Sequence, residues 1–215
     1  MIHLYHCNDA RSFRPLWAME ELGLDYELTV MPFPPRVLAK EFKAINPLGT
    51  IPALIDGETF MTESAAITQY LVTRYGPSPL AVEVEDPAYG AWLNWLHFGE
   101  ATLTFPQTLV LRYRRQEPGR GEAVADDYAK WFLARLRAVD RALEGGAQWL
   151  CAGRFTAADI SVGYALLLAD QLGFVPDFSP TVAAYWARLQ ARPGFQAAKA
   201  SQIRHAPAGV EGSSI

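Results

Sequence analysis

The chain has 215 residues, of which 50% are hydrophobic and 20% are charged, so it can fold as one large domain or two modest ones. The formal net charge of −4 is mild, and no basic block suggests a nucleic-acid partner. Only two cysteines occur, Cys7 and Cys151, which excludes a disulfide framework and fits a cytoplasmic protein. We expect neither a secretory signal nor a membrane partner, because the first residues lack the signal pattern and the apolar runs are too short to span a bilayer.

Strand and helix signals alternate over the first third of the chain. Residues 2–5 favour a short strand, and Ser12 then precedes a helical run that Gly23 is suited to end. Residues 26–30 predict a second strand, and a proline-rich loop leads from it to a weak helix over residues 37–44.

A hairpin signal follows. Residues 52–55 and 58–61 are strand-like and are separated by an Asp-Gly pair, which favours a tight turn. Helical spacing of apolar residues then continues over residues 63–75. The predicted order is β-α-β-α-β-β-α, which indicates an α/β domain with a small sheet and helices on its faces.

The Gly-Pro-Ser-Pro run at residues 76–79 predicts a domain boundary. We therefore expect a first domain over residues 1–77 and a second, all-helical domain over residues 86–206. Residues 88–115 predict one long helical stretch. A later helix is indicated by apolar residues three or four positions apart: Tyr128, Phe132, Leu136, Val139 and Leu143.

The last predicted helices have clear start signals. Thr156 and Asp159 form a capping-box pattern, in which each side chain satisfies a backbone N–H near the other residue. Ser179 followed by proline predicts the start of a further helix, which Arg-Pro-Gly at residues 192–194 is expected to end.

Pro52 stands at the start of a predicted strand, where it cannot donate a hydrogen bond to a neighbouring strand. If the Ile51–Pro52 bond is cis, the backbone N–H and C=O of Ile51 turn outward and can pair with a bound peptide. The alternative is an ordinary trans proline at a sheet edge.

Glu63 and Ser64 stand where the following helix begins. The Ser64 hydroxyl and the first N–H groups of that helix are suited to a carboxylate, and Glu63 is suited to an ammonium group. The alternative is that both residues only cap the helix.

In combination, these features closely resemble the glutathione-binding core of cytosolic glutathione transferases. The resemblance lies in Asn-Pro-Leu-Gly-Thr-Ile-Pro-Ala-Leu at residues 46–54, the hairpin, and Glu-Ser-Ala-Ala-Ile at residues 63–67. Residues 11–27 look like the family's first helix and second strand, and residues 155–160 look like its buried helix cap. Together the three motifs, in order and at the family's spacing, are highly specific.

The resemblance implies a thioredoxin-like first domain, a helical second domain with a pocket for an apolar co-substrate, and a homodimer. It implies glutathione as co-substrate, with no metal. Ile51 would offer its backbone to the cysteinyl part of glutathione, with Pro52 cis, and Glu63 and Ser64 would hold the γ-glutamyl end. The glycyl carboxylate would be met by one of three residues: Arg36, Lys40 or Thr50.

The residue that activates the thiol departs from the family's pattern. Ala10 occupies the serine position of the Ser-Arg-(Ser/Ala)-x-Arg signature that some relatives carry. Ser12 is the leading substitute, because a helix N-terminus supports a thiolate and because aryl-ether-cleaving bacterial relatives carry a similar stretch. The alternative is a plain capping serine. Asn8 could donate to the sulfur, and Arg11 could supply positive charge.

Cys7 offers another route, since a cysteine nucleophile would form a mixed disulfide with glutathione. We favour the alternative that Cys7 is a small buried apolar residue. His6 and His97 have no partnered acid or metal-ligand spacing and are expected to be structural or surface residues. In the second domain, the aromatic residues toward Phe105 and Tyr113 could line the co-substrate pocket.

The sequence thus predicts a detoxifying glutathione transferase that joins the glutathione thiol to an apolar electrophile. One alternative is a glutathione-dependent disulfide reductase or aryl-ether-cleaving enzyme on the same fold. Another is a non-catalytic glutathione-binding or assembly domain, which the loss of serine at Ala10 would allow.

Overall fold

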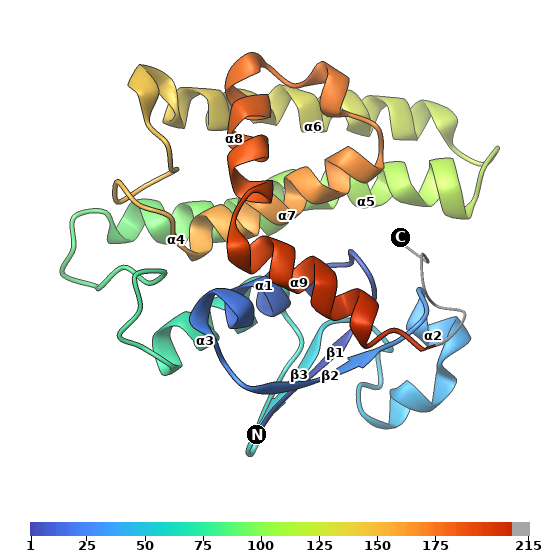
Figure 1. The fold of residues 1–215 in the computed structure, drawn as a ribbon. Helices are drawn as coiled ribbons and strands as arrows, with labels where there is room; N and C mark the ends of the chain where they lie inside the picture. The colour runs from blue at the N-terminus through green and yellow to red at the C-terminus, as the bar shows by residue number, and fades with distance from the viewer. Residues whose placement is uncertain (208–215) are drawn as a thin grey trace. The chain divides into compact units, whose positions relative to one another are not determined.

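The computed structural model describes residues 1–207, which form two compact units (Figure 1). The first unit contains residues 1–78 and the segment that starts at Ala191. The second unit is Pro79–Gln190. Each unit has its own core and is described separately.

The first unit is built on a four-stranded sheet in the order β2-β1-β3-β4. β1 runs parallel to β2 and antiparallel to β3, which pairs with β4 as the predicted hairpin. The turn of this hairpin has Gly57 in the left-handed region, at φ 60°, which glycine adopts without strain. The strands are β1 (Ile2–His6), β2 (Tyr26–Val30), β3 (Ala53–Asp56) and β4 (Thr59–Met61).

Helices pack around this sheet in the predicted β-α-β-α-β-β-α order, so the predicted α/β fold of the first domain is confirmed. α1 contacts both α3 and α9. Gly23 ends α1 in the left-handed region, as predicted. The elements are α1 (Phe13–Leu22), α2 (Pro35–Leu38), the 3-10 helix η1 (Lys40–Ala44), α3 (Ser64–Arg74) and α9 (Pro193–Arg204).

α8 starts at Pro180 and ends at Gln190, just before residues 192–194, as predicted. The further helix α9 was not predicted; Pro193 is its first residue, where proline's missing N–H costs no hydrogen bond. Phe195 then packs edge-on against Phe13 and Trp17 of α1, with ring centroids 5.3 and 5.0 Å away. These contacts place α9 in the first unit, whereas the predicted division assigned residues up to 206 to the second domain.

The second unit has only helices among its described residues, as predicted. The predicted stretch over residues 88–115 is continuously helical, but it contains two π-helical segments. Pro106 lies just after the first of them, where it cannot donate to the preceding turn and favours such a widening. The elements are α4 (Tyr89–Phe98), η2 (Gly99–Thr104), α5 (Phe105–Leu111), η3 (Arg112–Gln116), α6 (Glu122–Ala142), η4 (Glu144–Gly146), α7 (Ala157–Gln171), η5 (Val175–Asp177) and α8 (Pro180–Gln190).

α7 is the buried centre of the second unit, and its predicted capping box is present. The Asp159 carboxylate accepts hydrogen bonds from the Thr156 N–H at 2.9 Å, the Leu150 N–H at 3.1 Å and the Tyr185 hydroxyl at 2.8 Å. Burial raises the pKa of Asp159 to about 6 in spite of these bonds. Across residues 1–207, no helix combines the length and the apolar character needed to cross a bilayer.

Candidate glutathione site

Four chain segments meet at one end of the sheet, which we call the site end. β1 ends there at His6, and the parallel strand β2 ends beside it at Val30. β3 runs the other way and therefore begins there, at Ala53, and β4 ends there at Met61. The loops that leave or enter these strands at the site end are residues 7–12, 31–34, 46–52 and 62–63.

The strand registers show which residues face each other at the site end. Tyr5 pairs with Ala53, so the same register continued by two residues brings Cys7 opposite Ile51. Leu54 pairs with Met61, so the hairpin register continued by two residues brings Pro52 opposite Glu63. Pro52 and Glu63, both predicted from the sequence to belong to the site, are therefore neighbours across the hairpin.

The Ile51–Pro52 peptide bond is cis. Within residues 1–207, neither backbone group of Ile51 takes part in a backbone hydrogen bond. The buried side chain of Asn46 fixes the loop before it, since Asn46 Nδ2 donates to the Thr50 C=O at 2.7 Å and to Thr50 Oγ1 at 3.2 Å. Thr50 itself is exposed.

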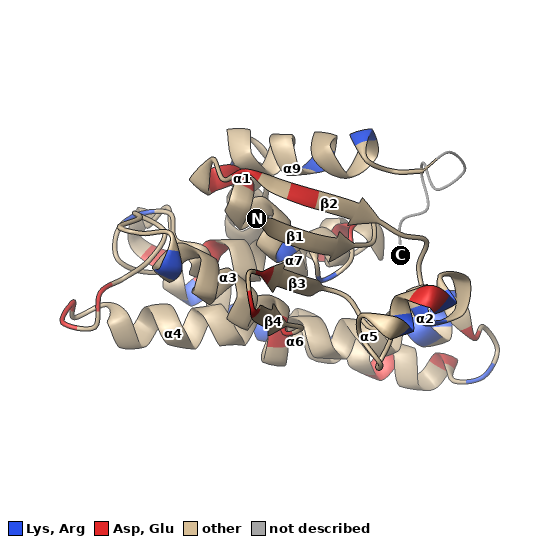
Figure 2. Ribbon diagram, turned by 90° about the horizontal axis from the view of Figure 1, so that it is seen from below, with Lys and Arg blue, Asp and Glu red and all other residues tan. Residues whose placement is uncertain are grey.

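Gly49 brings the α2 region against this loop. Its φ is 60°, and a Cβ at this position would lie only 2.7 Å from the Cβ of Arg36. Arg36, Lys40 and Lys43 are all exposed around this contact, and Figure 2 shows the basic residues gathered at α2. Within the described chain, none of the three forms an ion pair, so their charge is available to an anion. Lys43 was not among the predicted residues.

Glu63 and Ser64 open α3. Glu63 is the N-cap residue, with extended backbone and an exposed side chain, and Ser64 is the first helical residue and only 3% exposed. The Ser64 hydroxyl accepts a hydrogen bond at 3.1 Å from Nη1 of Arg14, which is fully buried. The sequence analysis did not single out Arg14, because its contact with Ser64 joins residues 50 positions apart.

Ser12 lies at the N-cap of α1, as predicted. It is fully buried and makes no capping hydrogen bond to the helix. Its Oγ instead accepts from the Cys7 N–H at 3.3 Å and lies 3.5 Å from the Cys7 C=O. The Ser12 hydroxyl thus contacts the backbone of its own loop, and its role in thiol activation stays a prediction.

Cys7 and His6 are both buried and uncharged. Cys7 Sγ lies 3.7 Å from the Pro32 carbonyl oxygen, and burial raises the pKa of the Cys7 thiol to about 12. Burial also lowers the pKa of His6 to about 4, and His6 Nε2 is bonded to Gln202 of α9. The burial of Cys7 agrees with the interpretation favoured from the sequence, a small buried apolar residue.

The remaining predicted residues of the loop differ in exposure. Asn8 is 5% exposed, whereas Arg11 is half-buried and so has the greater access to solvent. Between them, Asp9 adopts a left-handed backbone with φ 53°. Its carboxylate accepts from Lys199 Nζ at 2.7 and 2.9 Å and from Gln202 Nε2 at 2.7 Å. We call these contacts the α9 clamp, because they tie the loop to α9.

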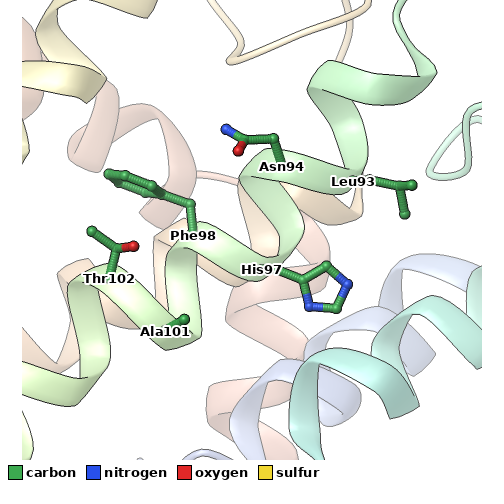
Figure 3. Close-up of a pocket in the computed structure, with 6 residues that line it drawn as sticks. All are labelled: Leu93, Asn94, His97, Phe98, Ala101 and Thr102. Carbon is green, nitrogen blue, oxygen red and sulfur yellow. The ribbon is translucent and has the colours of Figure 1, made fainter.

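The predicted aromatic stretch of the second unit is partly exposed. Trp92 and Leu103 are core residues, while Phe105 is 54% exposed and Tyr113 is half-buried. A shallow groove of about 380 Å³ lies along the same helical stretch (Figure 3). It is lined by Leu93, Asn94, His97, Phe98, Ala101 and Thr102. Among residues 1–207, no cluster of three His, Cys, Asp or Glu side chains is arranged for a metal ion.

Known proteins resemble the chain along nearly its whole length. The model of the N-terminal domain of glutathione S-transferases matches residues 3–79. Glutathione S-transferase 3 of Zea mays is 31% identical over 191 residues, which cover 83% of each protein. The crystal structure of a glutathione transferase from Methylococcus capsulatus superposes with a TM-score of 0.82 at 29% identity, over 94% of this chain and 98% of that one. The transferase URE2P6 from Phanerochaete chrysosporium, solved with oxidized glutathione, has a TM-score of 0.82 at 25% identity and covers 95% and 97%.

Proposed function

Because this chain belongs to the glutathione S-transferase family and is an enzyme of that family, we propose that it joins the thiol of glutathione to an apolar electrophile. The observation that carries the proposal is the site end of the sheet. Ile51 offers open backbone groups there, opposite the loop that follows β1, and the hairpin places Glu63 next to the same point.

The polar groups of the site match those of a γ-glutamyl-cysteinyl-glycine peptide. The Ile51 backbone can pair with the cysteinyl residue, as one more strand would. Exposed Glu63 is suited to the ammonium group, and Ser64 with the N-terminal N–H groups of α3 is suited to the neighbouring carboxylate. The glycyl carboxylate calls for a cation or a hydroxyl donor. Lys40, Arg36 and Thr50 are exposed and are suited to bind it.

We assign the stabilisation of the thiolate to Arg11 and Asn8 rather than to Ser12. A free thiol has a pKa of about 8.5, so the site must favour the anion through positive charge or hydrogen bonds. Arg11 is half-buried and carries a permanent charge, whereas the Ser12 hydroxyl is enclosed in its loop. Ser12 then shapes the loop that presents the other two side chains.

In this proposal the second unit binds the electrophile. Phe105 and Tyr113 are aromatic and partly exposed, and they are the candidates for this contact. The chemistry of disulfide exchange through Cys7 has less support, because a buried thiol with a raised pKa is a poor nucleophile. We also propose a cytoplasmic location, consistent with two buried cysteines that form no disulfide. A homodimer is proposed on membership of the family alone.

Calorimetric titration with glutathione, combined with conjugation assays, tests the proposed function. The wild-type protein should bind glutathione and conjugate an aryl halide, and Glu63→Gln should weaken binding roughly tenfold or more through loss of the charge-assisted bond. Cys7→Ser should keep the activity. A protein that binds glutathione but conjugates nothing would be the non-catalytic domain instead. Activity toward hydroxyethyl disulfide that disappears in Cys7→Ser would support the reductase.

A further inference from the structure

The loop after β1 begins with a tight turn that its own sequence does not favour. The Ala10 N–H donates to the Cys7 C=O at 3.1 Å, which closes a turn of four residues. Asp9, at the third position of this turn, has a φ of 53°, which is the pattern of a type II turn. That position favours glycine, because a side chain strains a left-handed backbone. The turn therefore needs support from outside the loop.

Gln202 of α9 supplies this support at the strained residue itself. Its Oε1 accepts from the Asp9 N–H at 3.1 Å, and its Nε2 donates to Asp9 Oδ1 at 2.7 Å. Both groups of one amide are thus used on one residue, and Gln202 is only 2% exposed. Lys199 donates to the Asp9 carboxylate and so adds charge, whereas Gln202 also binds the Asp9 backbone.

His6 fixes the orientation of the Gln202 amide. The Asp9 carboxylate, which is paired with Lys199, can only accept, so the Gln202 group that faces it must be the NH2. Gln202 Oε1 then lies 3.0 Å from His6 Nε2, and this ring nitrogen must carry the proton. His6 is fully buried, and burial lowers its pKa to about 4, so the ring stays neutral. The amide is therefore held in one orientation from both sides.

The bond to the Asp9 N–H selects the type of the turn. Type I and type II turns differ by about half a rotation of their central peptide, which here joins Asn8 to Asp9. In the flipped form the Asp9 N–H would leave Gln202, and the Asn8 C=O would turn towards Gln202 Oε1. Two acceptors would then face each other without a proton between them. Gln202 thus favours the observed turn over type I, the commonest alternative.

This turn directs the two side chains to which we assign the stabilisation of the thiolate. Asn8 is the second residue of the turn, and Arg11 follows its last residue, so the turn type sets the direction in which both leave the loop. We propose that Gln202 is a positioning residue for thiol activation, which holds the turn in the form that presents Asn8 and Arg11 to the glutathione sulfur. The inference rests on the proposed function and adds to it a residue of α9 that lies 193 positions from Asp9.

The pKa of the glutathione thiol in the binary complex, measured from the ultraviolet absorbance of the thiolate, tests this role. At a pH below that pKa, Gln202→Met should lower the thiolate fraction roughly tenfold, the effect of losing one hydrogen bond to a charged group. The affinity for S-methylglutathione should stay within about twofold, because a contact made only by the thiolate does not affect a ligand without one.

A glycine at position 9 separates positioning from a general structural role. Asp9→Gly lets the backbone adopt a positive φ without the α9 clamp. The double variant Asp9→Gly/Gln202→Met should therefore recover the thiolate fraction to within about threefold of wild type, whereas a merely structural contact of α9 would gain nothing from a change at position 9. Ser201→Ala is the matched control. It removes the hydrogen bond between buried Ser201 and Tyr26 from the same helix and should leave the pKa of the bound thiol unchanged.

The outcomes separate this inference from the proposed function. If the wild-type protein binds no glutathione, or binds it without lowering the thiol pKa from about 8.5, the proposed activation fails and the inference fails with it. If the wild-type protein lowers that pKa but Gln202→Met leaves it unchanged, or glycine gives no recovery, the inference alone is wrong.

A second pair of variants decides if Gln202→Met does not fold. Asp9→Ala and Asp9→Gly both remove the carboxylate, but only glycine adopts the positive φ without strain. Asp9→Ala should therefore lose thiolate, and Asp9→Gly should retain it. Equal thiolate fractions in the two variants would contradict the role of the turn.

Discussion

Arg11 and Ser12 are adjacent in the chain, yet the fold gives them different surroundings. Arg11 keeps access to solvent, whereas Ser12 is enclosed and bonded to the backbone of Cys7. Only a side chain that reaches the bound sulfur can stabilise a thiolate directly. We therefore expect substitutions at the two positions to have different effects on the pKa of the bound glutathione thiol.

Arg11→Ala should raise the pKa of the bound thiol toward the value of about 8.5 for free thiols, because the thiolate loses a nearby positive charge. The ultraviolet absorbance of the thiolate, followed against pH in the binary complex, measures this pKa. The conjugation rate below that pKa should fall in parallel.

Ser12→Ala is the matched comparison. It should lower the free energy of unfolding by about 1 kcal/mol, as expected for one lost hydrogen bond, and leave the pKa of the bound thiol unchanged. If Ser12→Ala raised that pKa as far as Arg11→Ala does, the role first predicted for Ser12 would be restored and the assignment to Arg11 would be wrong.

The sequence predicts backbone features at this scale better than side-chain directions. The hairpin and the turn before Pro52 follow from local chemistry, because proline and Asp-Gly restrict the backbone wherever they occur. Whether Ser12 faces a ligand or its own loop depends on how α1 packs against elements far away in the chain. The pairing of Arg14 with Ser64 joins residues 50 positions apart and has no local signal.

At the scale of elements, the capping box at the start of α7 contains a buried carboxyl group, that of Asp159. Asp159 has a pKa of about 6 in the folded chain, against 3.8 for an ordinary aspartate. The folded state therefore binds a proton more tightly than the unfolded state does, and the stability that this supplies is fully present below about pH 4. It is lost as the pH rises through about 6, by a total of about 3 kcal/mol.

Asp159→Asn removes this titration. The difference in unfolding free energy between wild type and Asp159→Asn should be larger near pH 4 than at pH 7, by about 3 kcal/mol. Urea denaturation at both pH values measures it. Asp127→Asn, an exposed change on α6, should show no such dependence. An equal difference at pH 4 and pH 7 for Asp159→Asn would mean that burial does not raise its pKa.

The α9 clamp is the second element-scale feature, and the sequence did not reveal it. Residues 193–204 begin with Pro-Gly and contain few large apolar residues, so no periodic signal marks a packed helix there. The clamp holds Asp9 in a left-handed backbone, which costs a non-glycine residue about 1–2 kcal/mol. Lys199 and Gln202 supply the hydrogen bonds that offset this cost.

Lys199→Met should therefore loosen the loop over residues 7–12. We expect a loss of about 2 kcal/mol in unfolding free energy, because the Asp9 carboxylate is nearly buried and loses its cation. Hydrogen exchange should show faster exchange of the amides in this loop. Lys130→Met breaks an exposed pair with Asp127 and should change stability by less than about 0.5 kcal/mol. Unchanged exchange in Lys199→Met would show that the loop holds its shape without α9.

At the scale of the whole molecule, the sequence predicts two domains and their fold classes, and the elements of each are present. Only the assignment of the last helix differs between the predicted division and the units defined by contacts. That assignment depends on packing between Phe195 and Trp17, which lie far apart in the chain, so composition and breaks near residue 77 could not determine it.

The proposed site predicts which backbone amides glutathione protects from hydrogen exchange. At a ligand concentration of about 100 times Kd, binding should stabilise the folded chain by about 2.7 kcal/mol. Hydrogen exchange should slow in the first unit, over residues 7–12, 49–52 and 63–67, because these segments supply the open backbone groups and the N-terminus of α3.

Amides in the middle of α6 should be unaffected, which makes them an internal reference within the same molecule. S-Methylglutathione should protect residues 49–52 and 63–67 equally, because the backbone and carboxylate contacts do not involve the thiol proton. Protection over residues 7–12 should be weaker, because S-methylglutathione has no thiolate to interact with Arg11. Protection confined to the second unit would place the ligand away from the site end of the sheet, and the assignment of Ile51, Glu63 and Ser64 would then fall as a group.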